Sequence, residues 1–146
     1  MAVTRVARSA LVAHSAEQMF LLVNDVRRYP EFVSGCVATE VLEEQPQLLV
    51  ATLQLKQAGI GLTLTTRNRL EPPSAMHLTL EQGPFQRLSG SWQFQPLGAA
   101  ACKVSLALEF ELAGSLASFA AGKLLASVAN SLVDGFARRA DQLYRQ

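Results

Sequence analysis

Charge is scarce in this chain. Asp, Glu, Lys and Arg make up only 17% of the 146 residues, against a usual share of about 25%. The 13 basic and 12 acidic residues nearly cancel. A nucleic-acid footprint needs clustered positive charge, so this balance argues against DNA as a partner. It also argues against firm electrostatic attachment to an anionic membrane.

Residues that build covalent or metal-based scaffolds are equally few. The chain has two cysteines, Cys36 and Cys102, and no Cys-x-x-Cys pair. We therefore expect no disulfide framework and two buried thiols. His14 and His77 have no neighbour at metal-ligand spacing, so we predict no metal site and place both histidines at the surface.

Motifs of common enzyme classes are also missing. The chain contains no Gly-x-Ser-x-Gly, no phosphate-binding loop with a terminal Lys and no Gly-x-Gly-x-x-Gly, so neither a nucleophile elbow nor a nucleotide site is indicated. Proton transfer inside a cavity needs a titratable group there. The rows expected to face inward lack Asp, Glu and His, so we predict a protein that is not an enzyme and needs no cofactor.

A long, weakly charged segment near the end of the chain is the strongest positive feature. Residues 114–133 carry one formal charge, Lys123, and the helical pattern continues to Tyr144. Serine, alanine and glycine are too frequent there for a typical transmembrane span. Apolar residues recur mostly at helical steps and form one stripe. The stripe consists of Leu116, Phe119, Leu125, Val128, Leu132, Phe136, Ala140 and Leu143.

Short segments of alternating polarity fill most of the rest of the chain. They cover residues 3–12, 37–42, 49–56, 60–65, 76–81, 88–95 and 103–112, with turn residues between them. This pattern is typical of antiparallel strands with one wet face. Ser15 and Gln18 form a capping box for a helix, and Pro30 starts a second short helix or turn. We predict a single α+β domain, residues 1–146, in which a curved antiparallel sheet of about seven strands grips the long C-terminal helix.

One stretch leaves its orientation open. Thr66 and Asn68 continue the inward row of residues 60–65, and two polar side chains on that row need partners such as a ligand or a water. A bulge near Thr65 would turn them outward and place Arg67 and Arg69 inside instead.

Seven ordered motifs resemble the bacterial ribosome association toxin family. They are Ser15-Ala-Glu-Gln-Met19, Val23-Asn-Asp-Val26, Tyr29-Pro-Glu-Phe32, Thr65-Thr-Arg-Asn-Arg-Leu-Glu-Pro-Pro73, Glu81-x-Gly-Pro-Phe85, Trp92-x-Phe94 with Pro96-Leu-Gly98, and Val128-Ala-Asn-x-Leu-Val-Asp134. This family is related to the mitochondrial coenzyme Q-binding START protein and belongs to the polyketide cyclase/dehydrase and lipid-transport superfamily. The likeness runs from about Val6 to Tyr144. The segment Val33–Cys36 departs from the relatives' pattern.

The resemblance implies a helix-grip fold (START-like or Bet v 1-like) with a cavity for a hydrophobic ligand, such as ubiquinone or a related prenylated lipid, in support of respiration. For some bacterial relatives it implies a toxin of a toxin–antitoxin pair that binds the large ribosomal subunit and interferes with subunit joining. Arginines that could cluster for such RNA contacts are Arg5, Arg8, Arg27, Arg28, Arg138 and Arg139.

The expected cavity residues come from the first helices, the strands and the long helix. They are Phe20, Tyr29, Phe32, Leu64, Thr66, Asn68, Leu78, Trp92, Phe94, Leu106, Phe119, Leu125, Val128 and Leu132. The N-terminal residues alternate in polarity, unlike a secretory leader. We therefore expect a cytoplasmic protein, with transient contact at the inner-membrane surface where a lipid would be exchanged.

Overall fold

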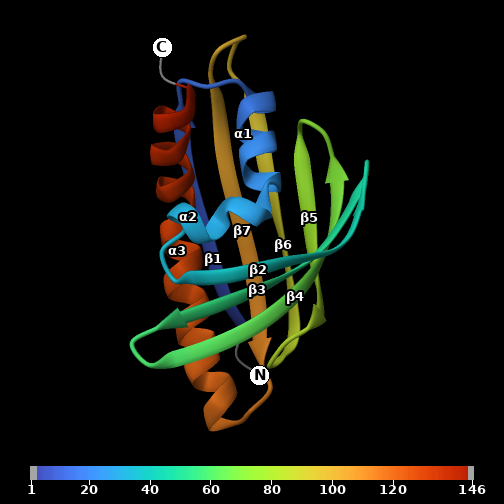
Figure 1. The fold of residues 1–146 in the computed structure, drawn as a ribbon, viewed down its shortest axis with the longest axis vertical. Helices are drawn as coiled ribbons and strands as arrows, with labels where there is room; N and C mark the ends of the chain where they lie inside the picture. The colour runs from blue at the N-terminus through green and yellow to red at the C-terminus, as the bar shows by residue number, and fades with distance from the viewer. Residues whose placement is uncertain (1–2, 145–146) are drawn as a thin grey trace.

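The chain runs through one strand, three short helical segments, six strands and one long helix (Figure 1). The computed structural model describes residues 3–144, so both ends of the expected domain, residues 1–2 and 145–146, lie outside the described residues. The strands are β1 (Val3–Val12), β2 (Cys36–Gln45), β3 (Leu48–Gln57), β4 (Ile60–Glu71), β5 (Ala75–Gln82), β6 (Phe85–Pro96) and β7 (Cys102–Leu112). The helices are α1 (Ala16–Asn24), the 3-10 helix η1 (Val26–Arg28), α2 (Tyr29–Phe32) and α3 (Leu116–Tyr144).

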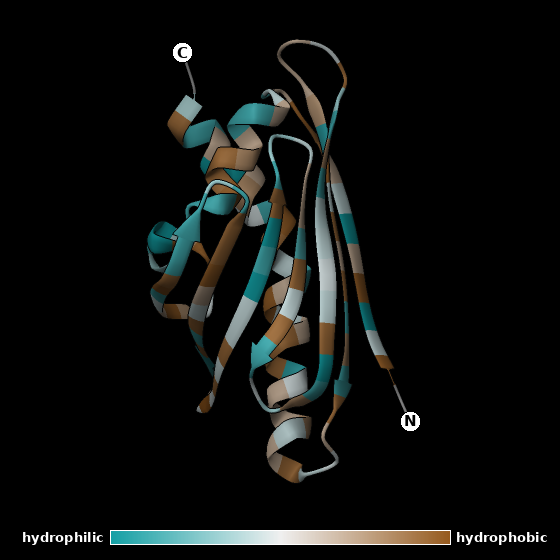
Figure 2. Cartoon of the chain, turned by 90° about the vertical axis from the view of Figure 1, so that its right-hand side faces the viewer, coloured by the Kyte–Doolittle hydropathy of each residue, from teal (hydrophilic) through white to brown (hydrophobic). Residues whose placement is uncertain are grey.

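All seven strands belong to one antiparallel sheet. Its order is β1-β7-β6-β5-β4-β3-β2, so β2 to β7 form a meander and β1 joins the free edge of β7. Alternating apolar and polar bands along the strands are visible in Figure 2. They reflect one face turned to α3 and one to solvent. The predicted sheet with its gripped helix is confirmed.

Irregular pairing gives the sheet its curl. One strand has an extra residue at Val37 and Leu42 in β2, at Glu81 in β5 and at Gln86 in β6. Each such bulge sets two residues against one and increases the local twist. In Figure 1 strands β2 to β4 therefore cross the view in front of α3, while β1 and β7 run along it.

The first helices follow the predicted capping chemistry. The Ser15 hydroxyl accepts from the Gln18 backbone N–H at 3.1 Å, and the Gln18 side chain accepts from the Ser15 N–H at 2.9 Å. This reciprocal pair is the capping box. Helix α2 begins at Tyr29, one residue before the predicted start, because Pro30 fits the first turn of a helix.

Helix α3 is long and apolar enough to cross a bilayer by length and composition, yet its apolar face packs against the sheet. The residues buried on it are Ser118, Ala121, Gly122, Leu124, Leu125, Val128, Ala129, Val133, Phe136 and Ala140. The segment before β2 lies directly on this helix. Gly35 has a φ of 90°, and a Cβ there would approach Val128 to 2.9 Å, so only glycine fits both the conformation and the space.

The prediction for His14 was wrong. The residue is 8% exposed, and its ring lies 2.7 Å from the Asp141 carboxylate on α3. The ring also packs against Tyr144, with centroids 5.7 Å apart. This cluster fastens the end of β1 to the end of α3 across a sequence separation that local spacing does not reveal.

Candidate functional site

An apolar cavity of about 90 Å³ lies between the inner face of the sheet and α3. Its walls come from α1 to α3 and from strands β2 to β7. The lining residues are Val23, Val26, Tyr29, Val33, Cys36, Ala51, Leu53, Leu55, Leu64, Thr66, Asn68, Met76, Leu78, Leu88, Trp92, Leu106, Leu108, Leu125, Val128, Ala129 and Leu132. Among these described residues none is Asp, Glu, Lys, Arg or His, so the cavity suits an uncharged molecule.

Helical spacing places the roof of the cavity. Leu125, Val128, Ala129 and Leu132 are three or four residues apart on α3 and so share one face. Ala129 is small, as is Ala51 on the opposite strand β3. Both are buried, and their short side chains leave the space that larger residues would occupy.

The orientation of β4 is settled in favour of Thr66 and Asn68. Both line the cavity, while Arg67 and Arg69 are exposed. The β3–β4 pairing is regular throughout. The bulge does exist, but Glu81 of β5 carries it, so β4 keeps its alternation and its inward row.

Ten of the fourteen predicted cavity residues line the cavity. These are Tyr29, Leu64, Thr66, Asn68, Leu78, Trp92, Leu106, Leu125, Val128 and Leu132. Their role in holding a ligand stays a prediction.

The other four predicted positions lie elsewhere, and their assignment to the cavity needs correction. Phe20 and Phe94 are buried in edge-on contact at 5.8 Å, behind the cavity wall. Phe32 packs on Phe136 at 5.3 Å. Phe119 is 52% exposed, because the first turns of α3 extend past the β3–β4 hairpin (Figure 1).

Eleven lining residues were not among the predicted positions. They are Val23, Val26, Val33, Cys36, Ala51, Leu53, Leu55, Met76, Leu88, Leu108 and Ala129. Strand alternation marks most of the strand members as inward-facing. It does not reveal which inward residues border a void, because that depends on how the sheet bends.

Two titratable side chains line the cavity, and burial keeps both protonated. The Tyr29 hydroxyl donates to the Val23 carbonyl, and desolvation raises the Tyr29 pKa above its usual value. Desolvation also raises the pKa of the Cys36 thiol. The Tyr29 proton is therefore engaged with the backbone. At neutral pH the cavity presents no charged group from its described lining.

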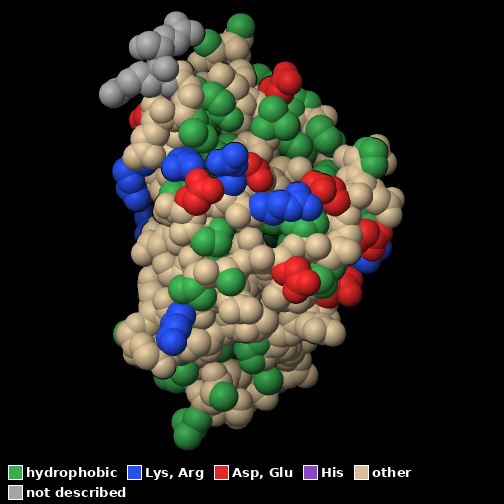
Figure 3. Space-filling view, viewed as in Figure 1, with side chains coloured by type: hydrophobic (Ala, Val, Ile, Leu, Met, Phe, Trp, Pro, Cys, Tyr) green, Lys and Arg blue, Asp and Glu red, His purple; other side chains and the backbone are tan. Residues whose placement is uncertain are grey.

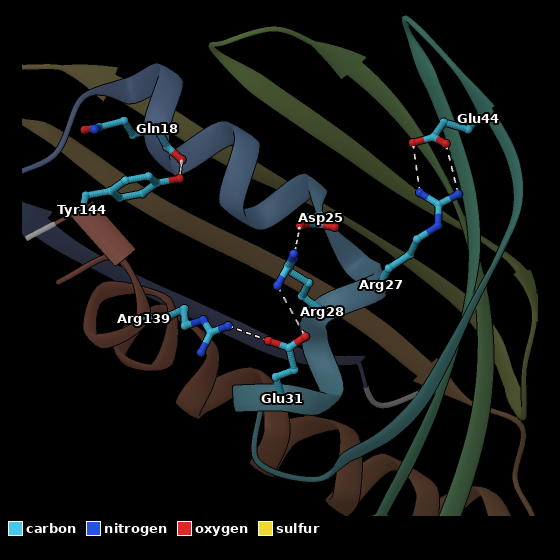
Figure 4. A network of polar contacts seen from close by, with 8 residues as sticks. All are labelled: Gln18, Asp25, Arg27, Arg28, Glu31, Glu44, Arg139 and Tyr144. Carbon is cyan, nitrogen blue, oxygen red and sulfur yellow. Dashed lines mark hydrogen bonds and ion pairs between the residues drawn. The ribbon is translucent and has the colours of Figure 1, made fainter. Parts of the chain in front are cut away.

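Helix α2 is held onto α3 beside the cavity (Figure 4). The Arg139 guanidinium lies 2.6 Å from the Glu31 carboxylate and covers the Phe32 ring at 5.0 Å from its centroid. The Phe136 ring of α3 contacts the Tyr29 ring edge-on, with centroids 5.3 Å apart. Ionic and aromatic contacts thus fix α2 against α3 on this side of the cavity.

A small surface hollow of about 30 Å³ lies next to these contacts, between the α2–β2 loop and α3. It shares Val33 and Leu132 with the cavity, so these two side chains form the partition between the interior and the surface. Val33 lies in the segment that departs from the relatives' motif. We therefore take this partition as the candidate entrance to the cavity.

Truncating one of the two partition side chains should make the cavity accessible to reagents in solution. We expect Leu132→Ala to speed alkylation of Cys36 about tenfold, which corresponds to opening that is easier by about 1.4 kcal/mol. Cys102 is an internal control, because it is fully buried and absent from the lining. Mass spectrometry of timed alkylation at mildly alkaline pH would measure both sites. An equal acceleration at Cys102 would indicate general loosening and contradict the partition.

Four of the six predicted arginines, Arg5, Arg27, Arg28 and Arg139, are paired with acidic side chains, while Arg8 bonds to the neutral Asn130 amide. Arg5 pairs with Glu109 at 3.1 Å, and Arg27 pairs with Glu44 at 3.1 Å. Hydrogen bonding from Arg27 lowers the Glu44 pKa. Figure 3 shows basic and acidic side chains interspersed on the face that carries α2 and β2. The predicted cluster is therefore largely neutralised on this face.

The known proteins that this chain resembles are named for lipid transport, for ribosome association and for coenzyme Q binding. A family described as polyketide cyclase/dehydrase and lipid transport matches residues 12–137. The ribosome association toxin RatA of Vibrio cholerae is 49% identical over 140 residues, which cover 96% of this chain and 97% of the relative. The mitochondrial coenzyme Q-binding protein of Schizosaccharomyces pombe is 26% identical over 141 residues, covering 90% and 84%.

Solved structures share the architecture. The Zhui aromatase/cyclase from Streptomyces has a TM-score of 0.85 at 22% identity, covering 99% of this chain and 97% of that one. At that identity the likeness shows the fold alone. An 18 kDa protein from Caulobacter crescentus has a TM-score of 0.74 at 26% identity, covering 98% and 99%.

Proposed function

The chain belongs to the polyketide cyclase/dehydrase and lipid-transport family, and from that premise we propose that it binds and carries a hydrophobic molecule. The observation that carries this proposal is the apolar cavity between the sheet and α3. Removing apolar surface from water drives such binding, at about 25 cal/mol per Å². The uncharged lining supports binding in preference to acid–base catalysis.

The ligand class we propose is a ring with a prenyl tail, such as ubiquinone. A relative named as a coenzyme Q-binding protein supports this choice. Trp92 lines the cavity and stacks on Phe94, so it offers an aromatic face to a ring. The tail would leave past Val33 and Leu132. Such a protein would work in the cytoplasm and exchange its ligand at the inner membrane.

The cavity must widen for this ligand. Pockets for small molecules typically measure about 300–1,000 Å³, and this one measures about 90 Å³. The space between the sheet and α3 is therefore smaller than such a ligand requires. Binding would displace the partition and the α3 side chains that form the roof.

Extraction and thermal unfolding test the proposal. Protein purified from its own host should release a quinone or related lipid into organic solvent. Adding a decyl-tailed ubiquinone analogue at about 100 times its Kd should stabilise the fold by about 2.7 kcal/mol, which raises Tm by about 5–10 °C for a domain of this size. An extract without lipid, together with an unchanged Tm, would refute ligand carriage.

A second candidate function is association with the ribosome. The relative named as a ribosome association toxin matches almost the whole chain at high identity, which favours this candidate. The paired arginines weigh against extensive phosphate contacts, which depend on free basic side chains. Co-sedimentation with the large subunit at two salt concentrations tests it directly.

A further inference from the structure

Asn68 is a buried amide without a partner. Its side chain lines the cavity, and the residue is only 7% exposed. Its Oδ1 atom is enclosed and has no hydrogen-bond partner among the described residues. Native proteins rarely leave buried polar atoms unsatisfied, so this oxygen points to a group that the cavity receives.

The sheet itself cannot satisfy this amide. The residues paired with Asn68 are Leu49 on β3 and Leu78 on β5, and both carry only apolar side chains. Thr66, two residues earlier on the same inward row, is flanked by Ala51 and Leu80. The two polar groups thus lie in an apolar surface, as orienting groups of a ligand pocket do.

The chemistry of the amide restricts what can satisfy it. Oδ1 is an acceptor and needs a donor, while Nδ2 is a donor and needs an acceptor. Rotating the side-chain amide by half a turn exchanges the positions of Oδ1 and Nδ2, but the group still offers one acceptor atom and one donor atom. The uncharged lining disfavours an ammonium donor. The remaining donor that suits a ring lipid is a hydroxyl, which also accepts.

Resting on the proposed function, we propose that the cavity prefers the hydroxylated form of its ring, a prenylated phenol or hydroquinone, over the oxidised quinone. The ring hydroxyl donates to the Asn68 amide oxygen. The Thr66 hydroxyl forms a hydrogen bond with a second oxygen on the ring. A quinone carries only carbonyl and ether acceptors, so it leaves Oδ1 without a partner.

The inference is tested by comparing decyl-ubiquinol with decyl-ubiquinone under anaerobic conditions. Trp92 is the single tryptophan of the chain and lines the cavity, so its fluorescence reports binding at this site. Calorimetry provides an independent Kd. We expect the quinol to bind about tenfold more tightly, as one added hydrogen bond to a buried partner allows.

Asn68→Leu should bring the two affinities together, because quinol binding loses the hydrogen bond to Oδ1 and weakens by about tenfold more than quinone binding does. Asn68→Ser, which keeps a hydroxyl, should restore part of the preference. In the unmodified protein, side-chain amide signals in NMR spectra should shift with the quinol and much less with the quinone. This measurement does not depend on any variant folding.

The outcomes separate the two proposals. If both probes bind equally, or Asn68→Leu keeps the preference for the quinol, the inference is overturned and ligand carriage stands. If neither probe binds, both are overturned. A preference for the quinol that disappears only in Asn68→Leu supports both.

Discussion

Phe136→Ala is expected to destabilise the fold by about 3–5 kcal/mol, the usual loss for a buried aromatic side chain. Phe136 is fully buried and stands at the centre of an aromatic cluster. Its ring lies 5.3 Å from Tyr29, 5.3 Å from Phe32 and 5.4 Å from Trp92, measured between centroids. Truncation would leave a void next to the apolar cavity, and neighbouring rings fixed by other contacts cannot refill it.

Phe119→Ala is the matched control on the same helix. Phe119 is 52% exposed, and its main specific contact is with the Lys123 ammonium, 5.1 Å from the ring centroid. An exposed contact of this kind contributes about 0.5–1 kcal/mol. Urea unfolding of both variants with unchanged m-values would measure the difference. Equal losses at the two positions would contradict the assignment of Phe136 to the centre of the buried aromatic cluster.

The contrast between these two residues shows what the sequence can predict. Both belong to the same apolar stripe at helical spacing, and the stripe correctly predicts a long helix lying on a sheet. Where the helix extends beyond that sheet depends on the length and bend of strands far away in the chain. Leu116 is accordingly 90% exposed, although its position in the pattern equals that of buried residues.

The inward row of β4 shows a related limit. Alternation alone predicts Thr66 and Asn68 inside, but a bulge in β4 would reverse them. The bulge belongs to β5, at Glu81, and no local feature of either strand distinguishes these two placements. The void itself is harder still to predict. Ala51 on the sheet and Ala129 on the helix line it, but small apolar residues are as common in tightly packed cores as beside cavities.

Ala129→Leu should abolish ligand binding with little effect on folding. Ala129 is 1% exposed on the roof of the cavity, so a larger side chain must enter a space of about 90 Å³. Apolar burial would offset part of the strain, which for overpacked cores is about 1–3 kcal/mol. We expect affinity for the decyl-tailed probes to fall at least a hundredfold, or about 2.7 kcal/mol. Trp92 fluorescence and the loss of the ligand-induced rise in Tm would measure it.

Ala117→Leu is the control, because Ala117 is exposed on the same helix and the added carbons meet solvent. Its affinity for the probes should equal that of the unmodified protein.

The Ala129→Leu variant also separates the two candidate functions. Ribosome association would use the outer surface, so co-sedimentation should survive in Ala129→Leu if that function is independent of the ligand. Full affinity for the probes in Ala129→Leu would show that they bind outside the cavity, and ligand carriage in this interior would have to be abandoned.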